Sequence, residues 1–168
     1  TATLPVRSPL PDNVPSTRAA PGIIASSAAA TAVPRSLCGW TEMITEFKCI
    51  EGWSTIVRWA GVRFSDFAER YYAGGLAALP PYVYLTTPDE LYYVGWDTPS
   101  IVHPQTLLAY EMNGAPLSPE HGAPLRIASP TKYGIKQIKR IGRVEFTSER
   151  PRDFWSEPEY GYDWYSGH

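Results

Sequence analysis

Cys49 is the residue of this sequence best suited to chemistry. It follows residues 41–48, in which apolar and polar side chains alternate, and this pattern predicts a strand over residues 41–50. Gly52 comes three residues later and breaks that strand, so we expect the thiol where a strand ends and a loop begins. A thiol with its free pKa of about 8.5 needs nearby positive charge or a metal to become a thiolate. Lys48 is one such charge, and the second half of the chain supplies more.

A stretch suited to binding an anion lies about seventy residues downstream. Between His121 and Val144 the chain has no Asp or Glu, but it has six cationic residues: Arg126, Lys132, Lys136, Lys139, Arg140 and Arg143. Several Gly and Pro residues interrupt this stretch and predict loops. Phosphate is the expected anion, because Arg, Lys and free backbone N–H groups bind it directly. The chain as a whole has a net charge of −2, so the positive charge is local, and we expect no nucleic-acid partner.

Length and composition indicate one domain with a real core. The chain has 168 residues, of which 43% are hydrophobic and 13% aromatic. Eleven Tyr and six Trp favour sheets and pocket walls, while seventeen Pro and thirteen Gly favour many loops. Strands mixed with short helices predict an α+β fold. No apolar run is long enough to span a membrane.

Familiar metal and nucleotide motifs are missing from the sequence. There is no Cys-x-x-Cys-His, no zinc-spaced Cys/His set and no Gly-x-Gly-x-x-Gly. The three His residues are far apart. A redox enzyme of this sequence would therefore carry its metal on an organic cofactor and exchange electrons with another protein.

The two cysteines leave a second class of function open. Cys38 and Cys49 permit one disulfide. In that alternative the chain is a non-enzymatic binding module with an aromatic ligand surface.

The first 39 residues differ from the rest of the chain. They contain no aromatic residue, six Pro and many Ala, Ser and Thr, so they are expected to form a disordered or loosely attached extension. No signal peptide is recognisable in them. The folded domain is predicted over residues 40–168.

The elements of the domain follow from periodicity and turn residues. We predict a helix over residues 64–71 with Ser65 as its N-cap, a strand over 82–86 and a helix that Pro104 opens and Asn113-Gly114 closes. Further strands are predicted over residues 125–128 and 141–146. The aromatic, acidic tail over residues 154–165 is expected to wrap the domain surface, or to form a pocket wall or partner-docking surface.

Four separated motifs, in order, resemble the oxidoreductase molybdopterin-binding domain of the sulfite oxidase family. They are Cys49-Ile50-Glu51-Gly52-Trp53-Ser54, Gly61-Val62-Arg63-Phe64, the run from Leu107 to Gly114, and His121-Gly122-Ala123-Pro124-Leu125-Arg126 with its continuation to Phe146. The resemblance covers residues 41–155. It implies a sulfite-oxidase-like molybdopterin-binding fold of mixed sheets, short helices and many loops. The ordered strands that relatives have before the Cys find no match here, so a degenerate relative unable to retain cofactor is a further alternative.

The resemblance also implies roles for individual residues. Cys49 would be the catalytic residue and the protein's metal ligand, completing a molybdenum site on a pyranopterin dithiolene. The positions that match cofactor-binding residues of the family are Thr87, His121, Arg126, Gln137, Ile138 and Lys139. Arg126 could fork onto a phosphate or pterin carbonyl, Lys139 would give a point charge, and Gln137 and Ile138 would act through backbone groups.

The implied reaction is two-electron oxygen-atom transfer on a small sulfur compound of the sulfoxide or sulfite type. Sulfite oxidases resemble this chain in having His at the position of His121. The sequence around Cys49 is more similar to that of methionine-sulfoxide reductases, so the resemblance leaves the substrate open. Arg58, Trp53 and His103 are candidate substrate residues. The resemblance further implies a haem or cytochrome electron partner, a monomer, and a periplasmic location.

Overall fold

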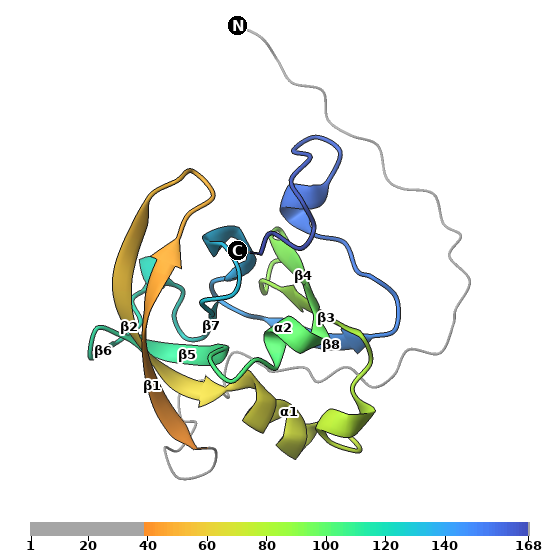
Figure 1. Ribbon diagram of the computed structural model, residues 1–168, viewed down its shortest axis with the longest axis horizontal. Coiled ribbons are helices and arrows are strands. Elements are labelled where there is room, and N and C mark those ends of the chain that lie inside the picture. The colour runs from red at the N-terminus through yellow and green to blue at the C-terminus, as the bar shows by residue number, and fades with distance from the viewer. Residues whose placement is uncertain (1–38, 168) are drawn as a thin grey trace, which may run out of the picture.

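The computed structural model describes residues 39–167, so the predicted extension lies almost entirely outside it. Two antiparallel sheets and two short helices make up the fold (Figure 1). The first sheet has the order β1-β2-β5-β6, with β7 also paired to β5, and the second has the order β4-β3-β8. The strands are β1 Trp40–Lys48, β2 Ser54–Arg63, β3 Tyr82–Thr86, β4 Tyr93–Asp97, β5 Leu107–Met112, β6 Ala115–Pro116, β7 Arg126–Ala128 and β8 Arg143–Thr147. The helices are α1 Phe64–Tyr71 and α2 Thr98–Ile101, with 3-10 helices η2 Leu76–Ala78, η3 Pro119–His121, η4 Gly134–Lys136 and η5 Phe154–Ser156.

The long hairpin of β1 and β2 is the main feature of the first sheet. Its register pairs Trp40 with Val62 at one end and Lys48 with Ser54 at the other. Gly52 closes the turn in a left-handed conformation with φ 94°, which glycine adopts without steric cost. A register shift follows between Ala60 and Gly61, where the chain passes against β5. A side chain at Gly61 would collide with the carbonyl oxygen of Leu108, so only glycine allows this approach.

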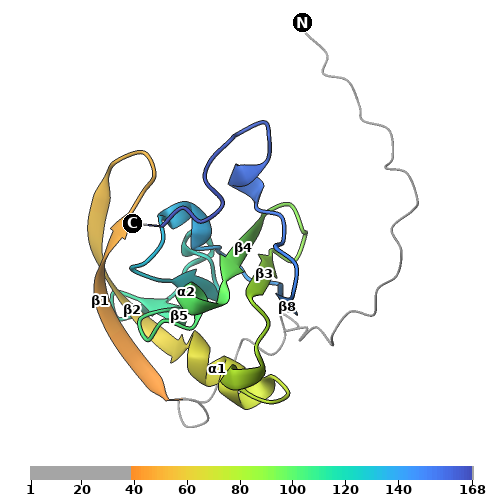
Figure 2. The same cartoon turned by 45° about the vertical axis from the view of Figure 1, so that its right-hand side comes forward.

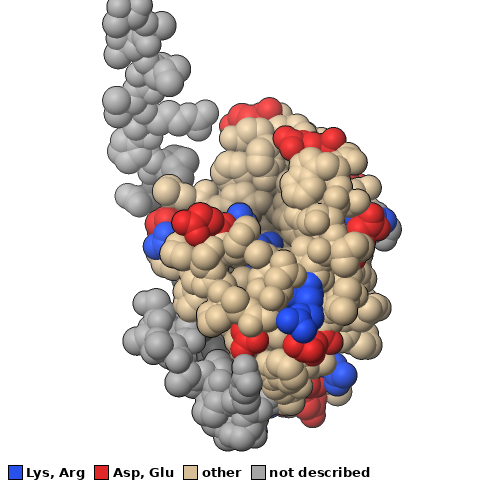
Figure 3. Space-filling model, turned by 90° about the vertical axis from the view of Figure 1, so that its left-hand side faces the viewer, with Lys and Arg blue, Asp and Glu red and all other residues tan. Residues whose placement is uncertain are grey.

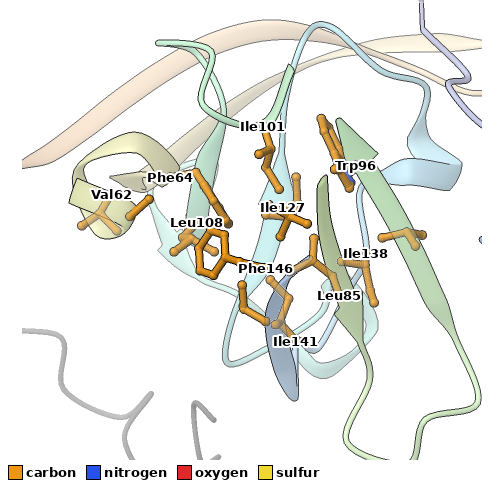
Figure 4. Packing of buried hydrophobic residues seen from close by; sticks show 14 residues of the cluster. Val62, Phe64, Leu85, Trp96, Ile101, Leu108, Ile127, Ile138, Ile141 and Phe146 are labelled. Atoms are coloured by element: carbon orange, nitrogen blue, oxygen red, sulfur yellow. The ribbon is translucent and has the colours of Figure 1, made fainter. Parts of the chain in front are cut away.

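The main core lies where the two sheets face each other. Buried side chains from β2, α1 and β5 meet side chains from β3, β4 and β8, and Figure 4 shows Phe64, Leu108 and Phe146 pointing toward one another. A smaller cluster packs on the first sheet and contains Met43, Val57, Trp59, Leu107, Ala109, Leu117 and Ala128. The smaller cluster borders the region that the sequence predicts as functional.

The strand at residues 107–112 corrects one prediction. Residues 107–112 form β5 and not the helix predicted to open at Pro104. Three consecutive residues, Leu107 to Ala109, are buried, because β5 is an inner strand of the first sheet. The periodicity of a short apolar run of this kind is compatible with a buried strand and with a helix. Here pairing with β2 and β7 makes it a strand.

The helix at residues 64–71 has the predicted bounds but not the predicted cap. Arg63 occupies the N-cap position and makes no side-chain cap hydrogen bond, so the assignment of Ser65 was wrong. Strands β2 and β4 were not predicted. Arg58, a candidate substrate residue, lies on β2.

The tail over residues 154–165 packs against the side of the second sheet. Trp164 is buried and contacts Gly95 of β4, while Trp155 Nε1 donates a hydrogen bond to the Tyr92 hydroxyl at 3.0 Å. The tail therefore wraps the domain, as one of the alternatives predicts. In the described residues, no helix has the length and apolar character needed to cross a membrane.

Candidate cofactor site

Two adjoining pockets lie between the β1–β2 hairpin and the loops around β7. Pocket A, of about 290 Å³, is lined by Phe47, Thr87, Tyr92, Arg126, Gly134, Gln137, Ile138 and Lys139. Pocket B, of about 300 Å³, is lined by Phe47, Trp53, Thr55, Ile56, Val57, Trp59, Met112, Asn113, His121, Arg126 and Lys139. The pockets share Phe47, Arg126 and Lys139 and therefore adjoin, and we call the two together the recess. All six residues predicted to bind cofactor line one pocket or both.

Arg126 forms the wall between the pockets and is 3% exposed. Its guanidinium donates hydrogen bonds to three backbone carbonyls, those of His121 at 3.0 Å, Gln137 at 3.3 Å and Ile127 at 3.3 Å. The guanidinium also lies 4.6 Å from the centroid of the Trp59 ring. Burial lowers the pKa of Arg126 to about 10.

The charge of Arg126 has no acidic counterpart in the described part of the chain. Within residues 39–167, no carboxylate lies within 4.0 Å of its guanidinium. A buried cation without a counterion is costly for the protein alone and becomes favourable when an anion binds.

Lys139 adds a second cation to both pockets. Its ammonium donates to the Glu120 carbonyl at 2.8 Å. Burial, and after it the charge of Arg126, lowers the pKa of Lys139. Gly122, with φ 100°, lies directly against it, since a Cβ there would come within 2.7 Å of the Lys139 Cβ. His121 ends η3 beside this contact and lines pocket B.

Thr87, Gln137 and Ile138 complete the wall of pocket A. The Thr87 hydroxyl donates to Asp89 and also holds the turn before Tyr92. The Gln137 side chain is committed to backbone groups of Ser129 and Lys132. Ile138 is buried, and its carbonyl accepts from Ile127 of β7. The polar tip of the Gln137 side chain is thus already engaged within the fold, and the role of Gln137 and Ile138 toward a cofactor stays a prediction.

Cys49 lies in the turn of the β1–β2 hairpin. Its backbone N–H donates to the Trp53 carbonyl at 2.9 Å, and its half-buried thiol lies 3.8 Å from a Glu51 carboxylate oxygen that also accepts from Trp53 Nε1. Cys49 does not line either pocket, but its hairpin contributes Phe47 and Trp53 to them. Figure 2 shows the turn of the hairpin beside the loops that follow β7.

The Cys49 thiol is free. The alternative of a Cys38–Cys49 disulfide requires it to be bonded, and Cys38 lies outside the described residues. The structure thus gives no support to the disulfide-based binding module.

The three candidate substrate residues are not gathered together. Trp53 lines pocket B. Arg58 is exposed on the opposite face of β2 from Trp59 and pairs with Glu42 at 4.0 Å. His103 follows α2, where its Nδ1 accepts from the Gln105 backbone, and it lines neither pocket.

Four other cations of the acid-free stretch have acidic partners elsewhere in the chain. Lys132 pairs with Asp97 at 2.8 Å and Lys136 with Asp153, and both lysines are buried. Arg140 pairs with Asp89 at 3.8 Å, and Arg143 with Glu145. The two buried lysines are therefore structural, and of the cations in this stretch Arg126 and Lys139 are the ones without an acidic partner among residues 39–167.

The sequence reasoning missed several residues of the recess. Phe47 and Tyr92 line pocket A, Trp59 lines pocket B, and Gly134 lets η4 approach the Phe47 ring, because a Cβ there would come within 2.6 Å of it. Phe47 is an apolar position of the alternating run over residues 41–48, and Trp59 lies in the region that resembles the family. Their positions in the sequence could therefore have indicated that they line the site. Viewed from the side of β1 and β2, the surface is mostly uncharged, with acidic and basic residues scattered in small groups (Figure 3).

Comparison with known proteins decides the family. Residues 32–155 match the sequence profile of the oxidoreductase molybdopterin binding domain. The chain belongs to the oxidoreductase molybdopterin-binding domain family. This confirms the sulfite-oxidase-family resemblance on which the site residues were predicted.

Comparison with individual proteins supports the same family assignment. The chain is 33% identical over 135 residues to the protein-methionine-sulfoxide reductase catalytic subunit of Xanthomonas campestris, covering 72% of this chain and 42% of that protein. It is 34% identical over 142 residues to the corresponding Campylobacter jejuni subunit, covering 72% and 46%. The chain thus spans less than half the length of these relatives.

A solved structure supports the predicted fold. The sulfane dehydrogenase SoxCD of Paracoccus pantotrophus superposes with a TM-score of 0.63 at 17% identity, over 73% of this chain and 35% of that one. The molybdopterin-binding domain therefore has the α+β, sulfite-oxidase-like fold expected from its motifs.

The residues of the recess fit the cofactor of the family. Molybdopterin carries a phosphate and several oxygen and nitrogen acceptors on a flat ring system. Buried Arg126, without a carboxylate partner, and Lys139 suit the phosphate and carbonyl acceptors. The aromatic side chains of Phe47 and Trp53 suit its ring system.

Proposed function

We propose that this chain is the molybdopterin-carrying part of an oxidoreductase that transfers an oxygen atom to or from a small sulfur compound. The observation that carries the proposal is the placement of Arg126. It is a buried cation between two pockets, fixed by three backbone carbonyls, with no acidic partner in the described chain. Five further residues predicted to bind cofactor line the same recess.

In this proposal each residue has a defined task. Arg126 and Lys139 bind the anionic and carbonyl oxygens of the cofactor, and the backbone around Gln137 and Ile138 holds its edge. Cys49 supplies a thiolate to the metal from the hairpin turn. The bound molybdenum cofactor supplies two-electron redox chemistry with transfer of one oxygen atom. Phe47 and Trp53, 5.9 Å apart between ring centroids, limit the access of water.

A sulfoxide is the substrate class that pocket B favours. Its walls are mainly apolar and aromatic, Arg58 does not line it, and the proposal assigns its cations Arg126 and Lys139 to the cofactor. A dianion such as sulfite would then lack the cations it requires, whereas an uncharged sulfoxide requires none. The two relatives compared above are named as methionine-sulfoxide reductase subunits. Reduction of a sulfoxide consumes two electrons and two protons and yields a sulfide and water. We propose that a separate haem or cytochrome protein delivers the electrons to a monomeric catalytic chain.

The first test is the molybdenum content of protein purified from a host that makes the cofactor, wild type beside Cys49→Ser. We expect near-stoichiometric molybdenum in the wild type. Cys49→Ser should lose sulfoxide reduction even if it keeps metal through the dithiolene. Absence of molybdenum and pterin from correctly folded wild type would overturn the proposal and favour the degenerate relative. A wild type that holds molybdenum but oxidises sulfite faster than it reduces sulfoxides would overturn the substrate class alone.

A further inference from the structure

Trp59 contains a polar group that the fold does not satisfy. The residue lies on β2, is 2% exposed, and lines pocket B. Its indole Nε1–H has no hydrogen-bond acceptor among residues 39–167. Buried donors are almost always paired in folded proteins, so an unpaired donor in a pocket wall is available to a ligand atom.

Other indoles of the same domain do have partners. Trp96, which is also fully buried, donates to the Lys136 carbonyl at 3.0 Å. Trp155 donates to the Tyr92 hydroxyl and Trp164 to the Pro151 carbonyl. Trp53, the other indole of pocket B, is exposed and donates to a Glu51 carboxylate oxygen at 3.3 Å. Among residues 39–167, Trp59 thus has a buried indole N–H that lacks the partner these other indoles have.

The surroundings of Trp59 indicate what the missing acceptor is. Its ring face is already occupied by the Arg126 guanidinium at 4.6 Å, which leaves the N–H at the ring edge for a different partner. His121, Arg126 and Lys139 line the same pocket and all offer donors or positive charge. A ligand in this pocket must therefore present acceptor atoms, and oxygen is the acceptor that an indole N–H and a guanidinium can share.

We propose that the Trp59 indole N–H donates a hydrogen bond to an oxygen acceptor of the molybdopterin, beside the group that Arg126 binds. Trp59 is then a cofactor-binding residue that has no counterpart in the set predicted from the sequence. The assignment rests on the proposed function, because it requires molybdopterin in the recess.

Two variants separate this role from a structural one. Trp59→Phe keeps an aromatic ring for Arg126 and removes the N–H, and Trp96→Phe is the matched control. We expect Trp59→Phe to hold pterin and molybdenum about tenfold more weakly, near the upper limit for one hydrogen bond. Its cofactor-free form should unfold no more easily than Trp96→Phe, which loses a satisfied bond. If the smaller ring disturbs folding, 3-benzothienylalanine at position 59 retains the shape without the N–H.

A spectroscopic measurement tests the bond directly. The six Trp residues give separate indole ¹⁵N–¹H signals, and the signal missing from Trp59→Phe identifies Trp59. Loading with cofactor should move the Trp59 signal downfield and leave that of Trp96 in place. An unmoved Trp59 signal, or equal pterin retention by Trp59→Phe, would overturn this assignment alone. Wild-type protein without pterin would overturn the proposed function as well.

Discussion

Lys136 and Asp153 form an ion pair in the interior of the domain, with each side chain 1% exposed. Lys136 belongs to η4, whose neighbours line pocket A, and Asp153 lies at the start of the tail. The Lys136 ammonium also donates to the Trp164 carbonyl at 2.6 Å, and Asp153 accepts from the Gly95 backbone at 3.0 Å. The pair therefore joins η4, β4 and the tail.

Breaking this pair should destabilise the domain strongly. Lys136→Met leaves Asp153 buried without a counterion, and loss of one partner of a buried pair costs about 3–5 kcal/mol. Urea unfolding monitored by tryptophan fluorescence measures the change. Lys139→Met is the control, because its side chain is largely exposed and should shift the free energy of unfolding by no more than about 0.5 kcal/mol. Similar values for the two variants would show that the pair is not what holds the loop.

The Asp97–Lys132 pair should make stability depend on acid pH. Burial raises the pKa of Asp97, but the Lys132 ammonium and the Ser100 hydrogen bonds together outweigh it, so the pKa lies below its ordinary value of 3.8. A depressed carboxyl pKa contributes stability above the unfolded pKa, and that contribution is lost as pH falls through the folded pKa. Asp97→Asn should therefore lower the free energy of unfolding by about 1–3 kcal/mol at pH 7.

The difference in the free energy of unfolding between wild type and Asp97→Asn should become smaller as the pH is lowered from 5 toward 3. Urea titrations at a series of pH values measure it, with the exposed Glu159→Gln as a control that follows the wild type. A gap that stays constant over this range would mean that Asp97 contributes through its cap of α2 and not through its charge.

Gly122, directly after η3, is a position beside Lys139 where a methyl group should do harm. Its φ of 100° disfavours other residues, and a Cβ there would press on both the Cα and the Cβ of Lys139. We expect Gly122→Ala to lower the free energy of unfolding by about 1–3 kcal/mol and to displace Lys139 from the recess. Differential scanning calorimetry gives the stability, and pterin content gives the displacement. Full pterin retention would contradict the placement of Lys139 at the cofactor.

Lys139 should matter for the ligand and little for the fold. Lys139→Met removes one of the two cations of the recess, and we expect cofactor to dissociate about tenfold faster at low salt. The loss of pterin fluorescence from loaded protein on dilution measures the rate. Arg63→Met removes one positive charge at the end of β2, away from both pockets, and should retain cofactor like the wild type. Equal rates of cofactor dissociation from the two variants would mean that cofactor binding depends on the net charge of the protein and not on the position of Lys139.

The sequence identified the family, whereas it predicted the secondary-structure elements less well. The motifs around Cys49 and His121 identified the family, and with it the six residues that line the recess. Strand β2 was missed because its register shift at Ala60–Gly61 interrupts the alternation, and β5 was taken for a helix because it is buried along one run. Both errors come from contacts between strands, which local periodicity does not contain.

The acid-free stretch shows that ion pairs between residues far apart in the sequence cannot be predicted from local sequence either. Lys132 and Lys136 looked like ligands for phosphate, but Asp97 and Asp153 reach them from 35 and 17 residues away. No window along the sequence reveals such pairing. Arg126 and Lys139 could be singled out only through the family motif, and Trp59 only through its unpaired N–H.

The bond between Lys136 and the Trp164 carbonyl has a consequence for biosynthesis. The loop that lines pocket A takes its final shape only when residues 153–164 have left the ribosome and folded back onto it. We therefore expect cofactor insertion to follow the synthesis of residues 153–164 and not to precede it. A ribosome stalled before Trp164 should carry a nascent chain that the cofactor-loading machinery of the cell does not fill.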